Sequence, residues 1–227
     1  FNSIVNDKHV TDRIRVTMLS GSFEYDSEDS LTVLVGYLHE NAPIIDTRLI
    51  VYQSESQVQS LSALDEDTDV LLVFTRRLTM EGAELERIKR YCTAGKPVVG
   101  IRTASHAFEQ WLEFDREVLG GNYDGHFSTG PRCQVEAAAP QDPILNGVQP
   151  FVSHGSLYRT SPLAGDARLL LMGRTDDQSQ PVAWVRGSSD RRVFYTSLGH
   201  QKDFWELDFL RLIENALLWA GGHAPPN

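Results

Sequence analysis

The chain has 227 residues, of which 41% are hydrophobic and 23% are charged, and its formal net charge is -10 at pH 7. This length and composition are typical of a soluble globular protein with a sizeable core. The negative charge and the lack of a stretch rich in Lys and Arg argue against a nucleic-acid partner. No apolar run approaches the roughly 20 residues that a membrane span needs.

The sequence has two cysteines, Cys92 in an expected helix and Cys133 in an expected strand. They form neither a CxxC metal pair nor a disulfide framework, and we expect both to be buried as small hydrophobic residues. Because the chain begins at Phe1, a cytoplasmic location and export after removal of an N-terminal signal both stay open. Homo-oligomerisation stays open as well.

The first half of the chain alternates expected strands and helices. Residues 1–13 are polar and without periodicity, so we expect an N-terminal arm. Apolar stripes at helical spacing, within residues 26–38 and 79–92, separate strands expected at 14–19, 47–52, 69–74 and 97–101. Such alternation predicts an α/β fold with a doubly wound, mostly parallel sheet flanked by helices.

The second half has a different texture. A Gly-rich loop at residues 119–127 precedes an expected strand at 133–137, and three further strands are expected at 168–172, 182–186 and 192–197. Residues 187–190 are expected to join the last two strands as a C-terminal antiparallel hairpin. A closing amphipathic helix ends at Gly221. With no convincing linker, we expect a single domain over residues 14–222, followed by a tail at 223–227.

A strand-to-helix elbow is expected where the strand that follows Pro97 stops at Arg102. Small residues after Arg102 can begin a helix, and in parallel α/β folds such an elbow lifts one side chain toward a ligand at the carboxyl edge of the sheet. The sequence therefore predicts that Arg102 lies close to the functional site.

Residues 14–220 resemble the ThuA-like (trehalose utilisation) family, a branch of the class I glutamine amidotransferase-like fold, which is flavodoxin-like. The specific motifs are the elbow at 100–108, Leu119-Gly120-Gly121 followed by His126, the turn around Pro143 and Gly147, and the aromatic-rich segments 182–184 and 192–200 that end in Gly199-His200. The resemblance implies a role in carbohydrate metabolism.

The sequence departs from the related amidotransferases at the catalytic positions. By resemblance, Arg102 occupies the place of the nucleophilic cysteine, and an arginine cannot attack a carbonyl. His200 aligns with the catalytic histidine, but Lys202 stands where the glutamate is expected. Family members commonly carry an acidic pair where this chain has Gly155 and Ser156. We therefore expect no glutamine hydrolysis.

The remaining polar groups suggest acid/base chemistry on a disaccharide, glycoside or keto sugar. His200 and His126 would handle protons, while Arg102 would orient or polarise an oxygen atom. Residues expected to bind the sugar are His106, Tyr123, His154, Tyr158 and Trp184.

Several alternatives stay open beside this hypothesis. The chain could be a non-catalytic sugar-binding module on the same fold. We expect no cofactor, although histidines from different loops could build a zinc site. Glycosidase chemistry with two carboxylates is disfavoured, because no facing acidic pair can be assigned.

Overall fold

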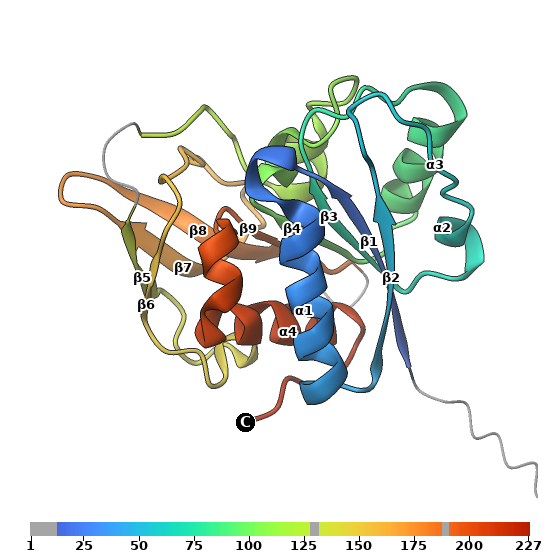
Figure 1. Ribbon diagram of the computed structural model, residues 1–227. Helices are drawn as coiled ribbons and strands as arrows, with labels where there is room; N and C mark the ends of the chain where they lie inside the picture. The colour runs from blue at the N-terminus through green and yellow to red at the C-terminus, as the bar shows by residue number, and fades with distance from the viewer. Residues whose placement is uncertain (1–12, 128–131, 188–190) are drawn as a thin grey trace, which may run out of the picture.

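The structure is a computed structural model that describes residues 13–127, 132–187 and 191–227. A nine-stranded sheet runs through these residues in the order β2-β1-β3-β4-β9-β8-β7-β5-β6 (Figure 1). Its strands are β1 (Ile14–Gly21), β2 (Ile45–Val51), β3 (Val70–Thr75), β4 (Val98–Ile101), β5 (Cys133–Ala137), β6 (Phe151–Ser153), β7 (Arg168–Arg174), β8 (Ser179–Arg186) and β9 (Val193–Thr196).

The sheet is parallel on one side and antiparallel on the other. Strands β2, β1, β3, β4 and β9 pair in parallel, with Val98 of β4 opposite Val193 of β9. From β9 outward, β8, β7, β5 and β6 all pair antiparallel. The sheet is thus mixed, within an α/β fold. Its antiparallel part has more strands than the expected C-terminal hairpin. Of the turn expected at 187–190, residues 188–190 lie outside the described residues.

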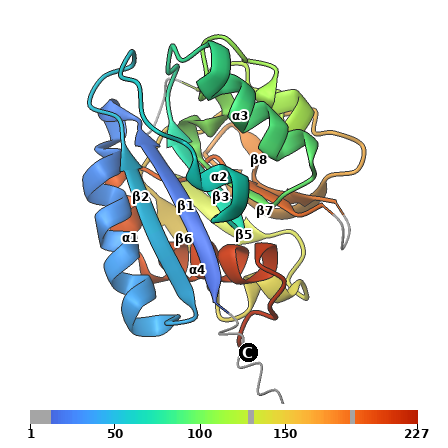
Figure 2. The same cartoon turned by 90° about the vertical axis from the view of Figure 1, so that its right-hand side faces the viewer.

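Helices cover both faces of the parallel half (Figure 2). Helices α1 (Ser27–Asn41) and α4 (Leu207–Ala220) lie on one face, and α2 (Ala63–Glu66) and α3 (Gly82–Thr93) lie on the other. The central strand β3 is buried at all six positions, as expected for a strand covered on both sides. Among the described residues, no helix has both the length and the apolarity needed to cross a membrane.

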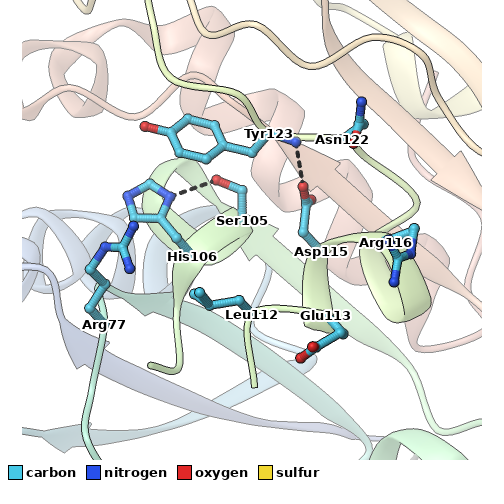
Figure 3. Close-up of a pocket in the computed structure, with 9 residues that line it drawn as sticks. All are labelled: Arg77, Ser105, His106, Leu112, Glu113, Asp115, Arg116, Asn122 and Tyr123. Atoms are coloured by element: carbon cyan, nitrogen blue, oxygen red, sulfur yellow. Dashed lines mark hydrogen bonds between the residues drawn. The ribbon is translucent and has the colours of Figure 1, made fainter. Parts of the chain in front are cut away.

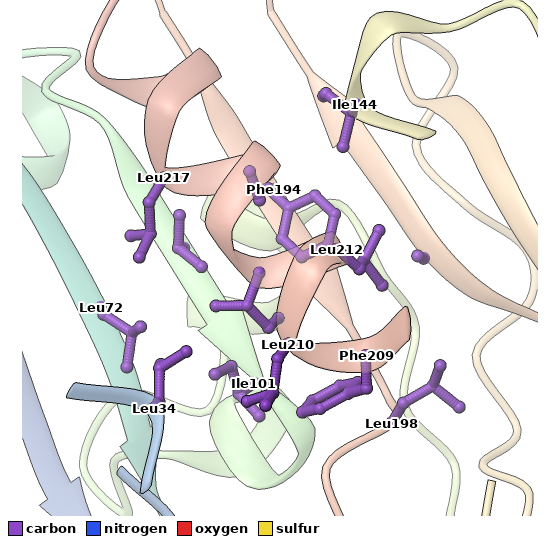
Figure 4. Packing of buried hydrophobic residues seen from close by; sticks show 14 of the residues in the cluster. Leu34, Leu72, Ile101, Ile144, Phe194, Leu198, Phe209, Leu210, Leu212 and Leu217 are labelled. Atoms are coloured by element: carbon purple, nitrogen blue, oxygen red, sulfur yellow. The ribbon is translucent and has the colours of Figure 1, made fainter. Parts of the chain in front are cut away.

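The larger core cluster lies between the sheet and the α1/α4 layer. Figure 4 shows apolar side chains of α4, including Phe209 and Leu217, packed against Phe194 of β9 and Ile101 of β4. All four side chains are fully buried. Because Ile101 is the last residue of β4, this packing fixes the end of the strand from which Arg102 projects.

The elbow follows β4, but it leads into less helix than expected. A 3-10 helix, Arg102–His106, takes the place of an extended α-helix, and a short π-helix, Asp115–Leu119, comes later. The expected strands otherwise overlap those observed. The short edge strand β6 was not expected from the sequence, because Val152 is followed at once by polar and small residues.

Candidate functional site

The backbone at Arg102 has the geometry of a sharp elbow. Its φ of 51° is in the left-handed region, which is strained for a residue other than glycine. The Tyr195 hydroxyl donates a 2.6 Å hydrogen bond to the Arg102 carbonyl oxygen. On the other side, Gly199 lies so close that a Cβ there would come within 2.7 Å of Ile101 Cγ2. Two residues of the 192–200 motif, Tyr195 and Gly199, therefore contact the backbone and the neighbours of the elbow.

The side chain of Arg102 is buried, with 2% of its surface exposed. One Nη atom donates to the Ser197 carbonyl oxygen at 2.6 Å, and the other donates to the Tyr25 hydroxyl at 3.2 Å and to Ser156 Oγ at 3.1 Å. The guanidinium carbon lies 3.9 Å from the centre of the Tyr158 ring. The guanidinium thus connects several loops at the carboxyl edge and does not project into open space.

This buried cation has no carboxylate partner within the part of the chain that the structure describes. Its charge is stabilised by a carbonyl, two hydroxyls and the faces of the Tyr158 and Tyr25 rings. Arg102 Nε has no hydrogen-bond partner there either. Arg102 therefore supplies a fixed positive field at the carboxyl edge.

The altered motif at Gly155 and Ser156 makes room for this arginine. A Cβ on Gly155 would lie 2.9 Å from an Nη atom of Arg102, and Ser156 accepts one of its hydrogen bonds. Gly155 and Ser156 therefore both contact Arg102.

We expect Gly155→Ala to lower the free energy of unfolding by about 1–3 kcal/mol, because the guanidinium is held on three sides and cannot shift freely. Urea denaturation measures the effect. The matched control is Gly36→Ala within α1, where nothing lies within 4 Å of the added Cβ. That change should stabilise the protein by about 0.5–1 kcal/mol. Equal effects at both positions would contradict the close contact.

Six aromatic and imidazole rings form a row across this edge of the sheet, with Arg102 beside its middle. Neighbouring ring centroids in the row are 6.4 Å apart for His154–His200, 6.2 Å for His200–Tyr25, 4.9 Å for Tyr158–Tyr123 and 4.4 Å for Tyr123–His106. Arg102 joins the two halves, since its guanidinium contacts both the Tyr25 and the Tyr158 ring. The ring row therefore consists of His154, His200, Tyr25, Tyr158, Tyr123 and His106.

His200 stands at the start of a 3-10 turn and is part-buried. Its Nδ1 accepts a 3.2 Å hydrogen bond from the Lys202 backbone N–H. Burial lowers the pKa of His200; the nearby Asp203 opposes this, while Arg102, His154 and Lys202 add to it. At neutral pH the ring is therefore uncharged, and its proton is on Nε2.

His154, the residue after β6, lies beside an acidic group. Its Nε2 is 3.2 Å from Glu206 Oε1. A fully buried carboxylate, Asp203, accepts hydrogen bonds from Ser153 Oγ and from the backbone N–H groups of His154, Gly199 and His200. One buried group thus fixes the backbone of both histidines.

A pocket of about 310 Å³ opens at the other end of the ring row (Figure 3). It lies where β3 and β4 end, and Figure 3 shows polar side chains arranged around it. The lining residues are Arg77, Ser105, His106, Leu112, Glu113, Asp115, Arg116, Asn122 and Tyr123. Both hydrogen-bonding groups and an aromatic face are therefore available to a polar ligand.

Two buried ionisable groups in this pocket have strongly shifted pKa values. Burial, together with the positive charges of Arg76, Arg77 and Arg102, lowers the pKa of His106 to about 3. Burial raises the pKa of Asp115 to about 6, although the Tyr123 N–H that donates to its Oδ2 opposes the rise. Asp115 Oδ1 has no hydrogen-bond partner among the described residues.

Of the eight predicted site residues, the structure brings six together and places His126 and Trp184 elsewhere. His106, Tyr123, His154, Tyr158 and His200 belong to the ring row, and Arg102 lies against it. His126 is exposed: its backbone pairs with Tyr158, and its Nδ1 is 3.2 Å from the Phe127 carbonyl oxygen.

Trp184 lies in the hydrophobic core and not at the pocket surface. It has 0% exposure, and its indole N–H donates to the Leu119 carbonyl oxygen at 2.8 Å. The alternation of β8 directs this ring inward, against Tyr195. A direct contact between Trp184 and a bound sugar would need the core to open.

Neither cysteine supplies a nucleophile at the elbow. Cys92 lies in α3 and Cys133 in β5, and both are buried. Burial raises the pKa of Cys92 to about 12 and that of Cys133 to about 11, so both remain thiols at neutral pH. Among the described residues, no three His, Cys, Asp or Glu side chains are grouped so that they could hold a metal ion.

Sequence reasoning missed Tyr25, Asp115, Asp203 and Glu206. Tyr25 could have been found, since it lies in the loop after the first strand, and loops after parallel strands meet at one edge. Asp203 and Glu206 precede the last helix and resemble ordinary helix-start residues. Asp115 gives no local signal, because its importance comes from burial by distant segments.

Comparisons with known proteins concern the family and the fold of the chain. A family model described as ThuA, trehalose utilisation, matches residues 15–220. A search of curated proteins gave no match.

Among solved structures, a ThuA-like protein from Parabacteroides merdae superposes with a TM-score of 0.72 at 18% identity, covering 95% of this chain and 92% of the other. A ThuA-like protein from Bacteroides uniformis gives 0.71 at 16% identity and covers 99% of both chains. A glutamine amidotransferase from Thermotoga maritima gives 0.54 at 14% identity, covering 92% of this chain and 94% of the other. At these identities the structural likeness shows the fold alone.

Proposed function

The chain belongs to the ThuA family of trehalose utilisation, and on that premise we propose that it binds a disaccharide, glycoside or keto sugar against the part-exposed rings of the ring row, Tyr25, Tyr123, His154 and His200, and acts on it by acid/base chemistry. The ring row is the observation that carries the proposal. Sugars have apolar faces that stack on aromatic rings, and they have hydroxyls that need polar partners. The pocket beside Tyr123 offers both kinds of contact.

The chemistry that suits these residues is removal of a proton next to a carbonyl. That step needs a base and a hydrogen-bond donor for the developing oxyanion, but it needs no nucleophile. His200, uncharged and with its proton on Nε2, would donate to the carbonyl oxygen. Arg102 would contribute through its fixed positive field, since protein groups occupy its guanidinium.

Sugar binding and turnover test the proposal directly. Calorimetry with trehalose, a 3-keto glycoside and glutamine is expected to show binding of the sugars only. Tyr123→Ala should weaken sugar binding about 10-fold through loss of a stacking face, whereas Tyr123→Phe should bind like the wild type. Turnover of the keto sugar should fall at least about 100-fold in His200→Ala. Absence of sugar binding would overturn the proposal, and so would equal binding by the two Tyr123 variants.

A non-catalytic sugar-binding module is the second candidate. The observation that favours it is the burial of Arg102, which leaves the former nucleophile position fully occupied by protein contacts. Sugar binding without turnover of trehalose or of 3-keto glycosides would support this function. Turnover would exclude it.

A further inference from the structure

The two histidines at one end of the ring row offer opposite hydrogen-bonding atoms. Glu206 faces Nε2 of His154, and a carboxylate only accepts, so neutral His154 has its proton on Nε2 and its lone pair on Nδ1. His200 receives the Lys202 N–H on Nδ1, so it has its proton on Nε2. A ring with a free acceptor nitrogen and a ring with a donor N–H are therefore neighbours, with centroids 6.4 Å apart.

The surroundings fix the backbone from which these two rings project. Asp203 is fully buried and binds the backbone N–H groups of both histidines, at 2.9 Å for His154 and 3.2 Å for His200. It also accepts from Ser153 Oγ and the Gly199 N–H, so four donors converge on one carboxylate. Such a satisfied buried network leaves the backbone at both histidines little freedom.

We propose that His154, oriented by Glu206, is the base of the site and that His200 is its oxyanion donor. This assignment rests on the proposed function. By resemblance, Lys202 stands where the amidotransferases have the carboxylate that pairs with the catalytic histidine. Here the pair is instead His154, which follows β6, and Glu206, which precedes α4. Glu206 is a positioning residue: it holds Nε2–H, and its negative charge stabilises the imidazolium that forms.

The step balances without an oxidant or a second reactant. A C–H bond next to the carbonyl of a keto sugar breaks, and the proton moves to His154 Nδ1. The electron pair of that bond forms a C=C bond to the carbonyl carbon, and the carbonyl π pair moves to oxygen. The resulting enolate accepts a hydrogen bond from His200 Nε2–H, and the reverse step returns the proton to carbon.

Hydrogen exchange measures this step apart from any later reaction. A 3-keto glycoside in D2O should lose its proton next to the carbonyl at a rate that NMR records. We expect His154→Gln to slow the exchange at least about 100-fold. Glu206→Gln should slow it about 10-fold. The controls His39→Gln and Glu40→Gln, exposed at the end of α1, should exchange like the wild type.

The tautomers give a readout that needs no substrate. At mildly alkaline pH, nitrogen-15 NMR should show Nε2–H on both His154 and His200, and Glu206→Gln should add the Nδ1–H form at His154 while leaving His200 unchanged. A wild-type Nδ1–H tautomer at His154 would overturn the proposal, as would undiminished exchange in His154→Gln. Sugar binding without exchange by the wild type would remove the base assignment but leave binding intact. Absence of binding would overturn both.

Discussion

Replacing Arg102 by Ala is expected to lower the free energy of unfolding by about 2–4 kcal/mol. Truncation of a fully buried large side chain typically costs about 3–5 kcal/mol, and the Ser197 carbonyl would lose its donor. The variant also lacks the desolvation penalty of the buried charge, which offsets part of this loss of stability. That offset is limited, because the guanidinium is already stabilised by a carbonyl, two hydroxyls and two ring faces.

Urea denaturation of Arg102→Ala and of a matched arginine variant measures the difference. Arg174→Ala removes an arginine whose ion pair with Glu136 is exposed on both sides, so it should change the free energy of unfolding by less than about 1 kcal/mol. If the two variants lose similar stability, the buried guanidinium contributes no more than a surface ion pair. In that case the loop connections made by Arg102 would not hold the site together.

The second large effect concerns stability in acid and His106. The native pKa of His106 is about 3, whereas an unfolded histidine titrates near 6.5. As pH falls below 6.5 the unfolded chain binds a proton that the native state does not bind, so the native state loses about 1.4 kcal/mol per pH unit. Since Gln cannot titrate, His106→Gln should gain about 2.5 kcal/mol relative to the wild type between pH 6 and pH 4.

Asp115 provides the opposite control in the same pocket. Its native pKa of about 6 lies above the usual carboxyl value of 3.8, so the native state binds a proton first as pH falls, and this stabilises the wild type. Asp115→Asn should therefore lose stability relative to the wild type over the same range. Urea denaturation at several pH values measures both slopes, and parallel curves for the three proteins would contradict the pKa shifts.

In the wild type, His106 and Asp115 contribute with opposite signs to the pH dependence of the free energy of unfolding. Between pH 6 and pH 4, proton uptake by Asp115 offsets most of the cost of keeping His106 uncharged. The wild type is therefore expected to show a flatter dependence on pH than either variant. The cations that face His106 are Arg76, Arg77 and Arg102, so a change in any of them should also alter the slope.

Local sequence patterns predicted most strands and helices because each pattern repeats within a few residues. The apolar run of β3 and the helical stripe of α1 depend on burial of a face that the sequence displays directly. The length of the antiparallel region was less accessible, since β6 has only three residues and its pairing with β5 depends on segments far apart in the chain.

The candidate site was predictable in part. Arg102 followed from the elbow pattern, and the structure places it at the end of β4. Its burial did not follow, because Tyr25, Ser156 and Ser197 come from three other loops. Likewise, the tautomer of His154 depends on Glu206, which lies 52 residues away in the sequence. Contacts across such separations are set by tertiary packing, and a single sequence does not display them.

The position of β9 has a consequence for how the chain folds. This strand lies between β4 and β8, so it joins the parallel and antiparallel halves, although it is the last of the nine strands in sequence order. Its partner β4 precedes it by 95 residues, counted from Val98 to Val193, and closing so long a loop is slow. During synthesis on the ribosome, β4 must therefore wait with an open edge until β9 emerges. We therefore expect the elbow, and with it the site, to form only after β9 has paired with β4.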